Sequence, residues 1–294
     1  MAERLSGKAV ADKLQSSMEE RIAALQEIGI TPAIALVRVG DKPDDISYEA
    51  SLVKRASELG IRVESYVLDA TATEEELLQT IEAINEDRFI HGCLMFRPLP
   101  QGIDEERVCN ALAPEKDIDG ITNASLTSVF TDGDLGFAPS TADACVKMLE
   151  FYDVPIQGAH VAVVGRSLVI GKPVAMMLLN RNATVTLCHS RTADVAAVTR
   201  DANIVVLASG RPKQYGTDFF SPGQIVVDVG INFDENGTMC GDADFEAVEP
   251  IVAGITPVPG GVGRVTTMVT LLHTVEAAEA AASEQTSIAI SRIM

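Results

Sequence analysis

The chain has 294 residues, of which 47% are hydrophobic, and it carries a formal net charge of −19 at pH 7. This length suits two domains with a sizeable core, and the charge argues against nucleic acids or anionic membranes as partners. The chain does not begin with a signal-like pattern and no apolar run reaches about 18 residues, so we expect a soluble, cytoplasmic protein.

The first half of the sequence alternates strand and helix patterns. We expect strands at residues 33–39, 61–68 and 92–96. We expect helices at about residues 46–59, at 73–85 with a capping box from Thr73 to Glu76, and at 105–112. This alternation predicts a parallel sheet covered by helices on both faces.

A helix at residues 141–151 is expected to lead into the second half, where four more strands are predicted at 160–164, 183–187, 203–207 and 224–229. A last helix, at about 265–282, should return to pack on the first half, and the tail beyond Glu279 reads as a helix that runs out into a loose end. We therefore predict an α/β protein of two α/β domains with a ligand cleft between them. The first comprises residues 1–138, completed by about 265–294, and the second, residues 139–264, is a Rossmann-like doubly wound parallel sheet.

The segment after the strand at 160–164 has the features of a phosphate-binding turn. Gly165 ends the strand and Gly171 opens a helix-like stretch, an arrangement that binds the pyrophosphate of a dinucleotide. It departs from G-x-G-x-x-G, because Ser167 replaces the second glycine and the third comes one residue late. Similar turns occur in α/β domains that bind no nucleotide, so the turn alone leaves both interpretations open.

The end of the next predicted strand favours NADP over NAD. An NAD site carries there an acidic residue for the ribose 2′-hydroxyl, whereas this chain has Ser190 and Arg191, with no carboxylate until Asp194. Arg166 in the turn adds a second cation, and such groups suit a 2′-phosphate. The alternative is that both arginines are solvated surface charges.

Cysteines and histidines give no metal-binding pattern. The five cysteines are widely spread without a C-x-x-C pair, and the four histidines have no ligand spacing with them. We expect reduced cysteines and no metal.

Four motifs resemble those of the methylenetetrahydrofolate dehydrogenase/cyclohydrolase family. They are VGDKP-x-x-x-SY at 39–48, PEKDIDG at 114–120, VVGRS-x-x-x-GKP at 163–173 and ITPVPGGVG at 255–263. The resemblance runs from about residue 5 to residue 280. It implies oxidation of 5,10-methylenetetrahydrofolate with NADP in one-carbon metabolism and purine biosynthesis. It commonly implies hydrolysis of the methenyl product to 10-formyltetrahydrofolate as well, in a cytoplasmic homodimer.

The resemblance also implies roles for single residues. Tyr48 would line the folate cleft, and Asp119 would hold the amino-pyrimidine edge of the pterin. The loop at 257–261 would form a backbone wall beside pterin and nicotinamide, where glycine lets a flat ring approach closely. Within it, the expected substrate contacts are Pro259, Gly260 and Gly261. The residues and the resemblance together give the expected cofactor contacts: Gly165, Arg166, Ser167, Gly171, Ser190, Arg191 and Ile231.

Two positions depart from the family pattern where hydrolysis depends on it. Leu52 stands where the family has a lysine four residues after Tyr48, and Phe96 stands where it has the glutamine that bonds this lysine. Lys54 is about 200° round the predicted helix from Leu52, and Arg97 points to the opposite strand face from Phe96, so neither should substitute.

The two reactions have different needs. Hydride transfer requires alignment and desolvation, whereas hydrolysis requires positioned acid–base groups. We therefore expect an NADP-dependent dehydrogenase with weak or absent cyclohydrolase activity. Three alternatives are a bifunctional enzyme with a water held by Tyr48 and Asp119, a non-catalytic folate- and NADP-binding homologue, and a dehydrogenase acting on another pterin or one-carbon carrier.

Two further residues differ from the family pattern. Arg264 replaces a proline and could meet either the cofactor phosphates or the glutamate tail of folate. His273 replaces an asparagine, and we expect it to be a packing or surface residue.

Overall fold

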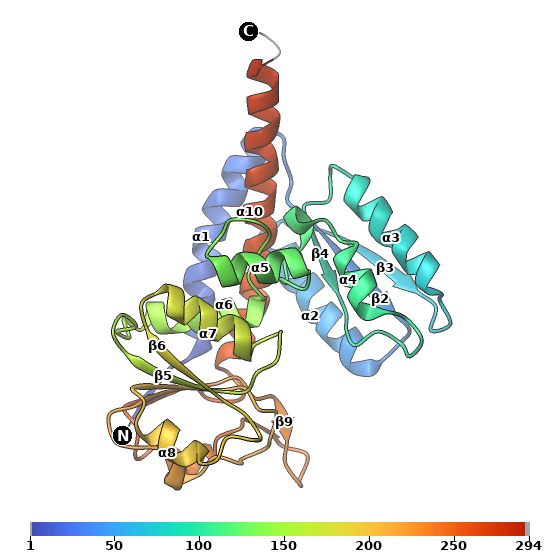
Figure 1. Ribbon diagram of the computed structural model, residues 1–294. Helices are drawn as coiled ribbons and strands as arrows, with labels where there is room; N and C mark the ends of the chain where they lie inside the picture. The colour runs from blue at the N-terminus through green and yellow to red at the C-terminus, as the bar shows by residue number, and fades with distance from the viewer. Residues whose placement is uncertain (1, 292–294) are drawn as a thin grey trace. The chain divides into compact units, whose positions relative to one another are not determined.

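The computed structural model describes residues 2–291, with side chains through residue 283 (Figure 1). The earlier elements are β1 (Glu3–Arg4), α1 (Gly7–Glu27), β2 (Ala33–Val39), α2 (Pro43–Leu59), β3 (Arg62–Leu68), α3 (Glu74–Glu86), β4 (Gly92–Met95), α4 (Glu105–Asn110), η1 (Pro114–Lys116), α5 (Asn123–Thr131) and α6 (Ser140–Phe151). The later ones are β5 (His160–Val164), α7 (Gly171–Asn180), β6 (Thr184–Cys188), α8 (Val195–Arg200), β7 (Ile204–Leu207), η2 (Thr217–Phe219), β8 (Ile225–Asp228), β9 (Asn232–Phe233), β10 (Met239–Cys240), α9 (Phe245–Val248), β11 (Gly254–Ile255) and α10 (Val262–Ser291).

The chain forms two compact units. Unit 1 consists of Met1–Lys13, Val129–Asp132 and Pro139–Val269. Unit 2 consists of Leu14–Ser128, Gly133–Ala138 and Thr270–Met294. None of the helices within the described residues combines the length and apolar composition needed to cross a bilayer.

Unit 2 contains a parallel three-stranded sheet in the order β3-β2-β4. The central strand β2 is buried on both faces, and its residues Ala35, Val37 and Val39 share one core cluster with α3 and α4. α2 contacts β3 and buries Leu52, Ala56 and Leu59. The parallel, helix-covered sheet expected from the alternating sequence is thus confirmed.

Local capping signals set the helix ends in unit 2. The predicted capping box is confirmed, because Thr73 Oγ1 accepts from the Glu76 N–H while the Glu76 carboxylate accepts from the Thr73 N–H. The predicted start of α2 is three residues too late, since Pro43 fits the first turn of a helix, where no N–H donor is needed.

Unit 1 contains a six-stranded sheet in the order β1-β11-β8-β7-β5-β6, in which every pair of neighbours is parallel. In Figure 1, α7 and α8 lie on opposite faces of this sheet. The chain runs from β5 to β6 on one side and then returns to β7 on the other. β5 is therefore the point at which the strand order reverses, and ligands of such sheets bind beyond the carboxyl ends of the strands there.

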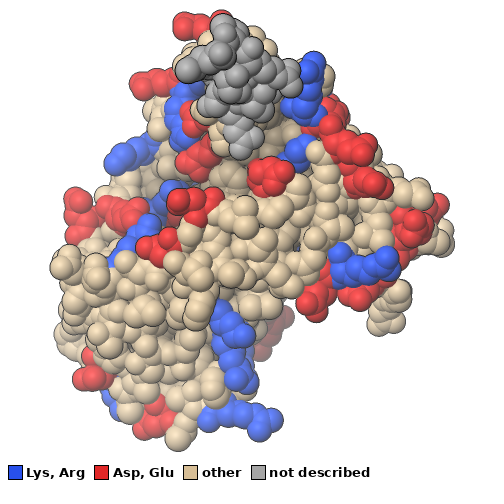
Figure 2. Space-filling model, turned by 45° about the horizontal axis from the view of Figure 1, so that its top comes forward, with Lys and Arg blue, Asp and Glu red and all other residues tan. Residues whose placement is uncertain are grey.

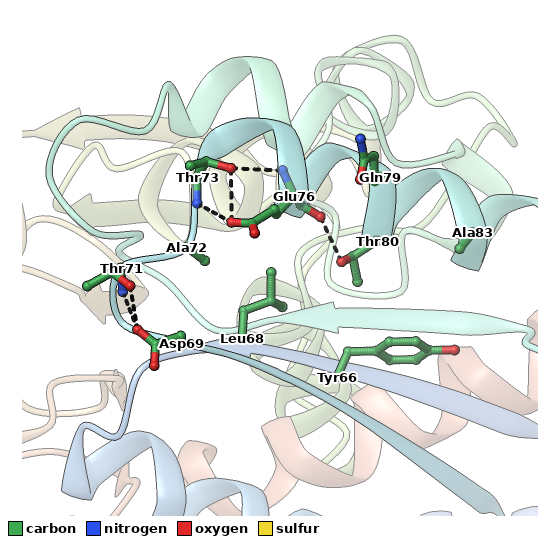
Figure 3. A pocket seen from close by; sticks show the side chains of 10 residues that line it. All are labelled: Tyr66, Leu68, Asp69, Thr71, Ala72, Thr73, Glu76, Gln79, Thr80 and Ala83. Carbon is green, nitrogen blue, oxygen red and sulfur yellow. Dashed lines mark hydrogen bonds between the residues drawn. The ribbon is translucent and has the colours of Figure 1, made fainter.

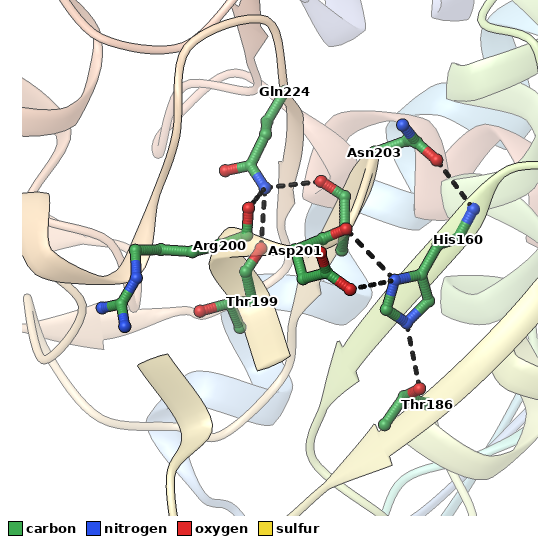
Figure 4. Close-up of polar contacts among 8 residues, drawn as sticks. His160, Thr186, Thr199, Arg200, Asp201, Asn203 and Gln224 are labelled. Atoms are coloured by element: carbon green, nitrogen blue, oxygen red, sulfur yellow. Dashed lines mark hydrogen bonds and ion pairs between the residues drawn. The ribbon is translucent and has the colours of Figure 1, made fainter. Parts of the chain in front are cut away.

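Hydrogen bonds occupy the backbone at the opposite, amino-terminal edge of this sheet (Figure 4). The His160 ring lies between the Asp201 carbonyl and the Thr186 hydroxyl, and Asn203 Oδ1 accepts from the His160 N–H. Gln224 Nε2 donates to the carbonyls of Thr199 and Ala202 at the end of α8. The residues at this edge are thus engaged in holding the strands and α8 together.

The last helix extends further than expected in both directions. From Thr270 onward it belongs to unit 2, where Arg21 pairs with Glu276 and Glu279. The expected loose end beyond Glu279 is helical up to Ser291, and residues 292–294 lie outside the described residues.

Candidate cofactor and folate sites

The turn between β5 and α7 depends on its two glycines for steric reasons. Gly165 has φ +131°, and a Cβ there would lie 2.1 Å from the Ala208 carbonyl oxygen. A Cβ on Gly171 would lie 2.2 Å from the carbonyl oxygen of Gly165. Ser167, in the place of the expected second glycine, accepts the Ile170 N–H at 3.1 Å through its hydroxyl. The serine therefore stabilises the first turn of α7.

A cavity of about 590 Å³ lies beyond the carboxyl ends of β5, β6 and β7. Its lining comes from the turn after β5, the segment between β6 and α8, and the loop after β7. The polar residues of this lining are Arg166, Ser167, His189, Ser190, Thr192, Asp194, Ser209, Arg211, Gln214 and Tyr215. The cavity therefore lies at the edge where a doubly wound sheet binds its ligand.

Of the expected cofactor residues after β5 and β6, Gly165, Arg166, Ser167 and Ser190 line this cavity, whereas Gly171 and Arg191 do not. Arg191 is exposed and stands outside the lining; its backbone N–H donates to His189 Nδ1 at 3.1 Å. His189 begins a tight turn, because its carbonyl accepts the Thr192 N–H and its own N–H donates to the Thr192 hydroxyl. Within this turn Ser190 lines the cavity and Arg191 does not. Arg211 from the loop after β7 lines the cavity instead.

Sequence reasoning missed Arg211, although one signal for it was present. Arg211 comes four residues after the last residue of β7, and in a parallel sheet the carboxyl ends of neighbouring strands meet at one edge. The cofactor residues were predicted from the ends of the first two strands alone, and Arg211 follows the third.

A buried carboxylate anchors the loop that carries Arg211. The side chain of Asp242, a fully buried residue, accepts the backbone N–H groups of Ser209, Gly210 and Arg211 at 2.6, 3.1 and 2.9 Å. It also accepts from the Asn232 side chain at 2.9 Å. These bonds fix the main chain of the loop and satisfy a carboxylate that would otherwise be costly to bury.

Asp228 forms a second layer beneath this loop. Its carboxylate accepts the backbone N–H groups of Gly230, Asp242 and Ala243 at 2.8–3.0 Å. Burial raises the pKa of the Asp228 carboxyl to about 7, although the three N–H donors act in the opposite direction.

The loop at 257–261 uses its glycines to fold against the start of α1. Gly260 has φ +107°, and its carbonyl accepts the Gly7 N–H at 2.9 Å. A Cβ on Gly261 would lie 2.6 Å from the Pro257 carbonyl oxygen, and one on Gly7 would lie 2.1 Å from the Gly261 carbonyl oxygen. Contacts of the chain with itself therefore already require these glycines, before any bound ring is considered. Pro259 is exposed at the tip of this loop.

Ile231 and Arg264 lie outside the 590 Å³ cavity. The Ile231 side chain is 63% exposed and is the nearest neighbour of the Cβ position of Gly263. Arg264 is exposed in the first turn of α10.

In unit 2, the expected folate tyrosine lies beside an apolar surface. The Tyr48 ring packs edge-on against Phe96, with 6.0 Å between centroids and 71° between planes. Leu52, one helical turn after Tyr48, is completely buried, and Phe96 is 7% exposed. Neither residue at the family's lysine and glutamine positions can donate or accept a proton.

The nearby cations are directed elsewhere, as the helix geometry predicted for Lys54. The strand β4 ends at Met95, so the expected strand alternation does not apply to Phe96 and Arg97. The Lys54 side chain is 77% exposed and lies 4.0 Å from Glu58. Arg97 Nη1 lies 3.7 Å from the Glu105 carboxylate.

Asp119 stands in a segment with a rigid backbone. The buried Asp117 accepts the N–H groups of Ile121 and Thr122 and the Ser125 hydroxyl at 2.7–2.9 Å. Lys116 Nζ donates to the carbonyls of Ile84, Asn85 and Asp87 at the end of α3. The half-buried Asp119 is therefore carried by a turn that is fixed on both sides.

His273 is a packing residue, as expected. It is buried, its Nδ1 lies 2.8 Å from the Ile118 carbonyl oxygen, and its ring stacks on Phe137 at 4.9 Å between centroids.

A second hollow, about 710 Å³ in volume, lies in unit 2 beside β3 and α3 (Figure 3). Several of its polar groups bond to one another: Asp69 accepts from Thr71, and Thr73 pairs with Glu76. None of the expected site residues lines it. Among the described residues, no group of three or more His, Cys, Asp or Glu side chains is placed to hold a metal ion.

The sheet, the glycine turn and the cavity at the switch point define unit 1 as a Rossmann-like, NAD(P)-binding type of domain. Residues 139–282 match the NAD(P)-binding domain of tetrahydrofolate dehydrogenase/cyclohydrolase, and residues 5–119 match the catalytic domain of the same proteins. The chain therefore belongs to the tetrahydrofolate dehydrogenase/cyclohydrolase family.

Similar proteins cover nearly the whole chain. The bifunctional protein FolD of Carboxydothermus hydrogenoformans is 46% identical over 281 residues, which are 95% of this chain and 98% of that protein. The FolD of Clostridium botulinum is 44% identical over 280 residues, 95% of this chain and 99% of that one.

Solved structures of proteins from the same family are similar to this one. The bifunctional FolD of Campylobacter jejuni superimposes with a TM-score of 0.93 at 36% identity, covering 95% of this chain and 99% of that one. The Trypanosoma brucei enzyme, solved with NADP and an inhibitor, gives a TM-score of 0.89 at 33% identity, covering 95% and 97%.

Proposed function

We propose that this protein is an NADP-dependent 5,10-methylenetetrahydrofolate dehydrogenase. The main support is the cavity beside the glycine turn, in which Arg166 and Ser190 meet at the carboxyl edge of the sheet. A guanidinium and a hydroxyl suit a 2′-phosphate, whereas NAD sites present a carboxylate to the 2′-hydroxyl. Asp194 does line the cavity, but its carboxylate accepts the Ala197 N–H and caps α8. The similar Trypanosoma brucei enzyme was solved with NADP.

When bound, NADP supplies the nicotinamide ring that accepts a hydride from the one-carbon unit of the folate. The lone pair of a folate nitrogen drives this loss, and the products are NADPH and the 5,10-methenyl cation. The protein has to align the two rings and exclude water. In this assignment Gly165, Ser167 and Gly171 hold the pyrophosphate at the start of α7, with Ile231 as a further cofactor contact.

We assign folate binding to Tyr48, Asp119 and the loop residues Pro259, Gly260 and Gly261. A carboxylate on a fixed turn suits the paired N–H donors of an amino-pyrimidine, and an exposed aromatic ring suits the flat pterin. In this proposal the domain of residues 1–138, completed by about 265–294, contributes Tyr48 and Asp119 to folate binding. The domain of residues 139–264 binds the cofactor and contributes the loop residues.

We further propose that cyclohydrolase activity is weak or absent. Hydrolysis needs a group that activates water and returns a proton to the departing nitrogen, which is worth roughly 10²–10⁴-fold in rate. The buried Leu52 and Phe96 offer no such group, and Lys54 faces solvent.

The names of the relatives support a second candidate function. Both FolD proteins are called bifunctional, which favours an enzyme that also makes 10-formyltetrahydrofolate. In this chain, such an enzyme would have to use a water held by Tyr48 and Asp119.

The experiment supplies the purified protein with 5,10-methylenetetrahydrofolate and either NADP or NAD, and follows formation of reduced cofactor. NADPH formation with a clear preference for NADP supports the proposal, and NADP binding without NADPH formation contradicts it. In a separate assay, the decay of 5,10-methenyltetrahydrofolate is compared with the buffer rate. Enzyme-dependent decay as fast as NADPH formation would establish the bifunctional alternative.

The setting proposed for this activity is one-carbon metabolism and purine biosynthesis in the cytoplasm, with the protein as a homodimer. All five cysteines lie within the described residues and are buried and free, which suits a reducing compartment. On the face shown in Figure 2, basic side chains lie singly or in small groups and form no large continuous patch of the kind that binds nucleic acids.

A further inference from the structure

Two arginines from different loops line the 590 Å³ cavity of unit 1. Arg166 follows β5 and Arg211 follows β7, and Ser190 follows β6 between them in sequence. Among the described residues, neither guanidinium takes part in an ion pair. The protein has 42 acidic residues, and eight of its other arginines do pair with an acid within the described part of the chain. Two unpaired guanidiniums at one cavity are therefore suited to an anionic ligand.

The main chain at Arg211 is positioned before any ligand binds. The buried Asp242 accepts three successive N–H groups, ending with that of Arg211 at 2.9 Å. Gly210, with φ +66°, supplies the left-handed turn that this arrangement needs. A guanidinium on a fixed stem loses less conformational freedom on binding than one on a mobile loop.

The acidic residue of this cavity does not neutralise Arg211. Asp194 begins α8, and its carboxylate accepts the Ala197 N–H at 2.8 Å. The cavity thus combines two cations and a serine hydroxyl with one carboxylate that is engaged in capping a helix.

We infer that Arg211 is a specificity-determining residue that binds the 2′-phosphate of NADP together with Arg166 and Ser190, and that Arg191 does not take part. A phosphate monoester presents several oxygens, and the planar fork of a guanidinium can bond two of them at once. This inference rests on the proposed cofactor and names the residues that select it.

The test measures binding of two fragments to the full-length protein by calorimetry: 2′,5′-ADP, which carries the 2′-phosphate, and 5′-AMP, which lacks it. The Arg211→Gln variant is expected to bind 2′,5′-ADP about 10–100-fold more weakly, with 5′-AMP binding changed less than about twofold. Arg211→Lys keeps the charge without the fork and should show a smaller loss than Arg211→Gln. Equal weakening of both fragments in Arg211→Gln, or no weakening of either, overturns the inference.

Arg191→Gln is the matched control, because Arg191 is an exposed arginine of the same unit outside the cavity. It should bind both fragments within about twofold of the unmodified protein, and a selective loss of 2′,5′-ADP binding in this variant contradicts the inference. The outcome is independent of catalysis. If Arg211→Gln weakens 2′,5′-ADP binding but the unmodified protein forms no NADPH, the proposed function is wrong and the inference holds. If the protein forms NADPH but Arg211→Gln leaves 2′,5′-ADP binding unchanged, only the inference is wrong.

Discussion

Gly165 shows how a single position couples the fold to the cofactor turn. Two constraints act on it, a φ of +131° and the carbonyl oxygen of Ala208 at 2.1 Å from a Cβ position. The first disfavours any residue with a side chain, and the second requires backbone to move.

Replacing Gly165 with alanine should therefore lower the free energy of unfolding by about 1–3 kcal/mol or more and abolish cofactor binding, because the turn must open. Urea unfolding and calorimetry with NADP measure the two effects. Gly216→Ala is the control, since Gly216 has an ordinary φ and no atom within 4 Å of its Cβ position. Equal behaviour of the two variants would show that the turn tolerates a side chain.

Asp228 gives a prediction about pH. Its pKa is raised from 3.8 to about 7 in the folded protein, chiefly by burial. Between these two values the folded state holds a proton that the unfolded state has released, so this contribution to stability is present below about pH 4 and is lost as pH rises towards 7.

The free energy of unfolding of the unmodified protein, relative to Asp228→Asn, should thus fall between pH 4 and pH 7, by at most about 1.4 kcal/mol per pH unit. Urea titrations of both proteins at several pH values measure the difference. Parallel pH profiles would show that Asp228 does not titrate in this range.

The sequence predicted which types of residue occur at the cofactor cavity, but not which arginines line it. Arg166, Ser167 and Ser190 line it because strand ends and the glycine turn fix where they stand. The direction of Arg191 depends on a local turn at His189, and the presence of Arg211 depends on an anchor at Asp242, 31 positions further along the chain. The place of Arg211 after a strand end could be read from the sequence, whereas the turn at His189 and the anchor at Asp242 could not.

At the scale of elements, α3 illustrates how both ends of a helix are satisfied. Thr73 and Glu76 cap its start, and Lys116 donates to three carbonyls at its end, at 2.6–2.9 Å. The lysine joins α3 to η1 and so to the turn that carries Asp119.

Lys116→Met should lower the free energy of unfolding by about 2–4 kcal/mol, because it leaves buried carbonyls without their charged donor. Chemical denaturation measures it. Lys54→Met serves as the control, since that side chain is 77% exposed and should change stability by less than about 0.5 kcal/mol. A Lys116 variant as stable as this control would mean that water replaces the lost donor without cost.

The helices and strands predicted from the sequence agree with the structure where the segment was long enough to show a periodic hydrophobic pattern or a capping motif. The capping box of α3 and the four- to seven-residue strands follow from local signals. β1 and β11 are two residues each, too short for alternation, and they exist because β1 pairs with β11 and β11 pairs with β8. Such strands are set by tertiary contacts rather than by local propensity.

At the scale of the molecule, the groups suited to the cofactor and the positions on which hydrolysis would depend lie in different units. The polar, cationic cavity belongs to unit 1. In unit 2, Tyr48 packs on Phe96, and Leu52, at the family's lysine position, is buried. The family could be predicted from the sequence, because its motifs are contiguous, whereas burial at these two positions required the structure.

The double substitution Leu52→Lys and Phe96→Gln should raise the rate of 5,10-methenyltetrahydrofolate hydrolysis by roughly 10–100-fold, part of what positioned acid–base groups provide. The decay of methenyl absorbance measures this rate. The single variant Leu52→Lys should gain less, because its buried ammonium then lacks a polar partner. NADPH formation in both variants checks that the fold and the cofactor site are intact; no gain with NADPH formation preserved would show that these positions do not limit hydrolysis.

The most direct measurement follows both products of one reaction started with 5,10-methylenetetrahydrofolate and NADP. The expected result is that NADPH and the methenyl cation appear in equal amounts, and that the cation then decays at the rate seen in buffer alone. NADPH accumulating together with 10-formyltetrahydrofolate, without the methenyl species, would contradict it.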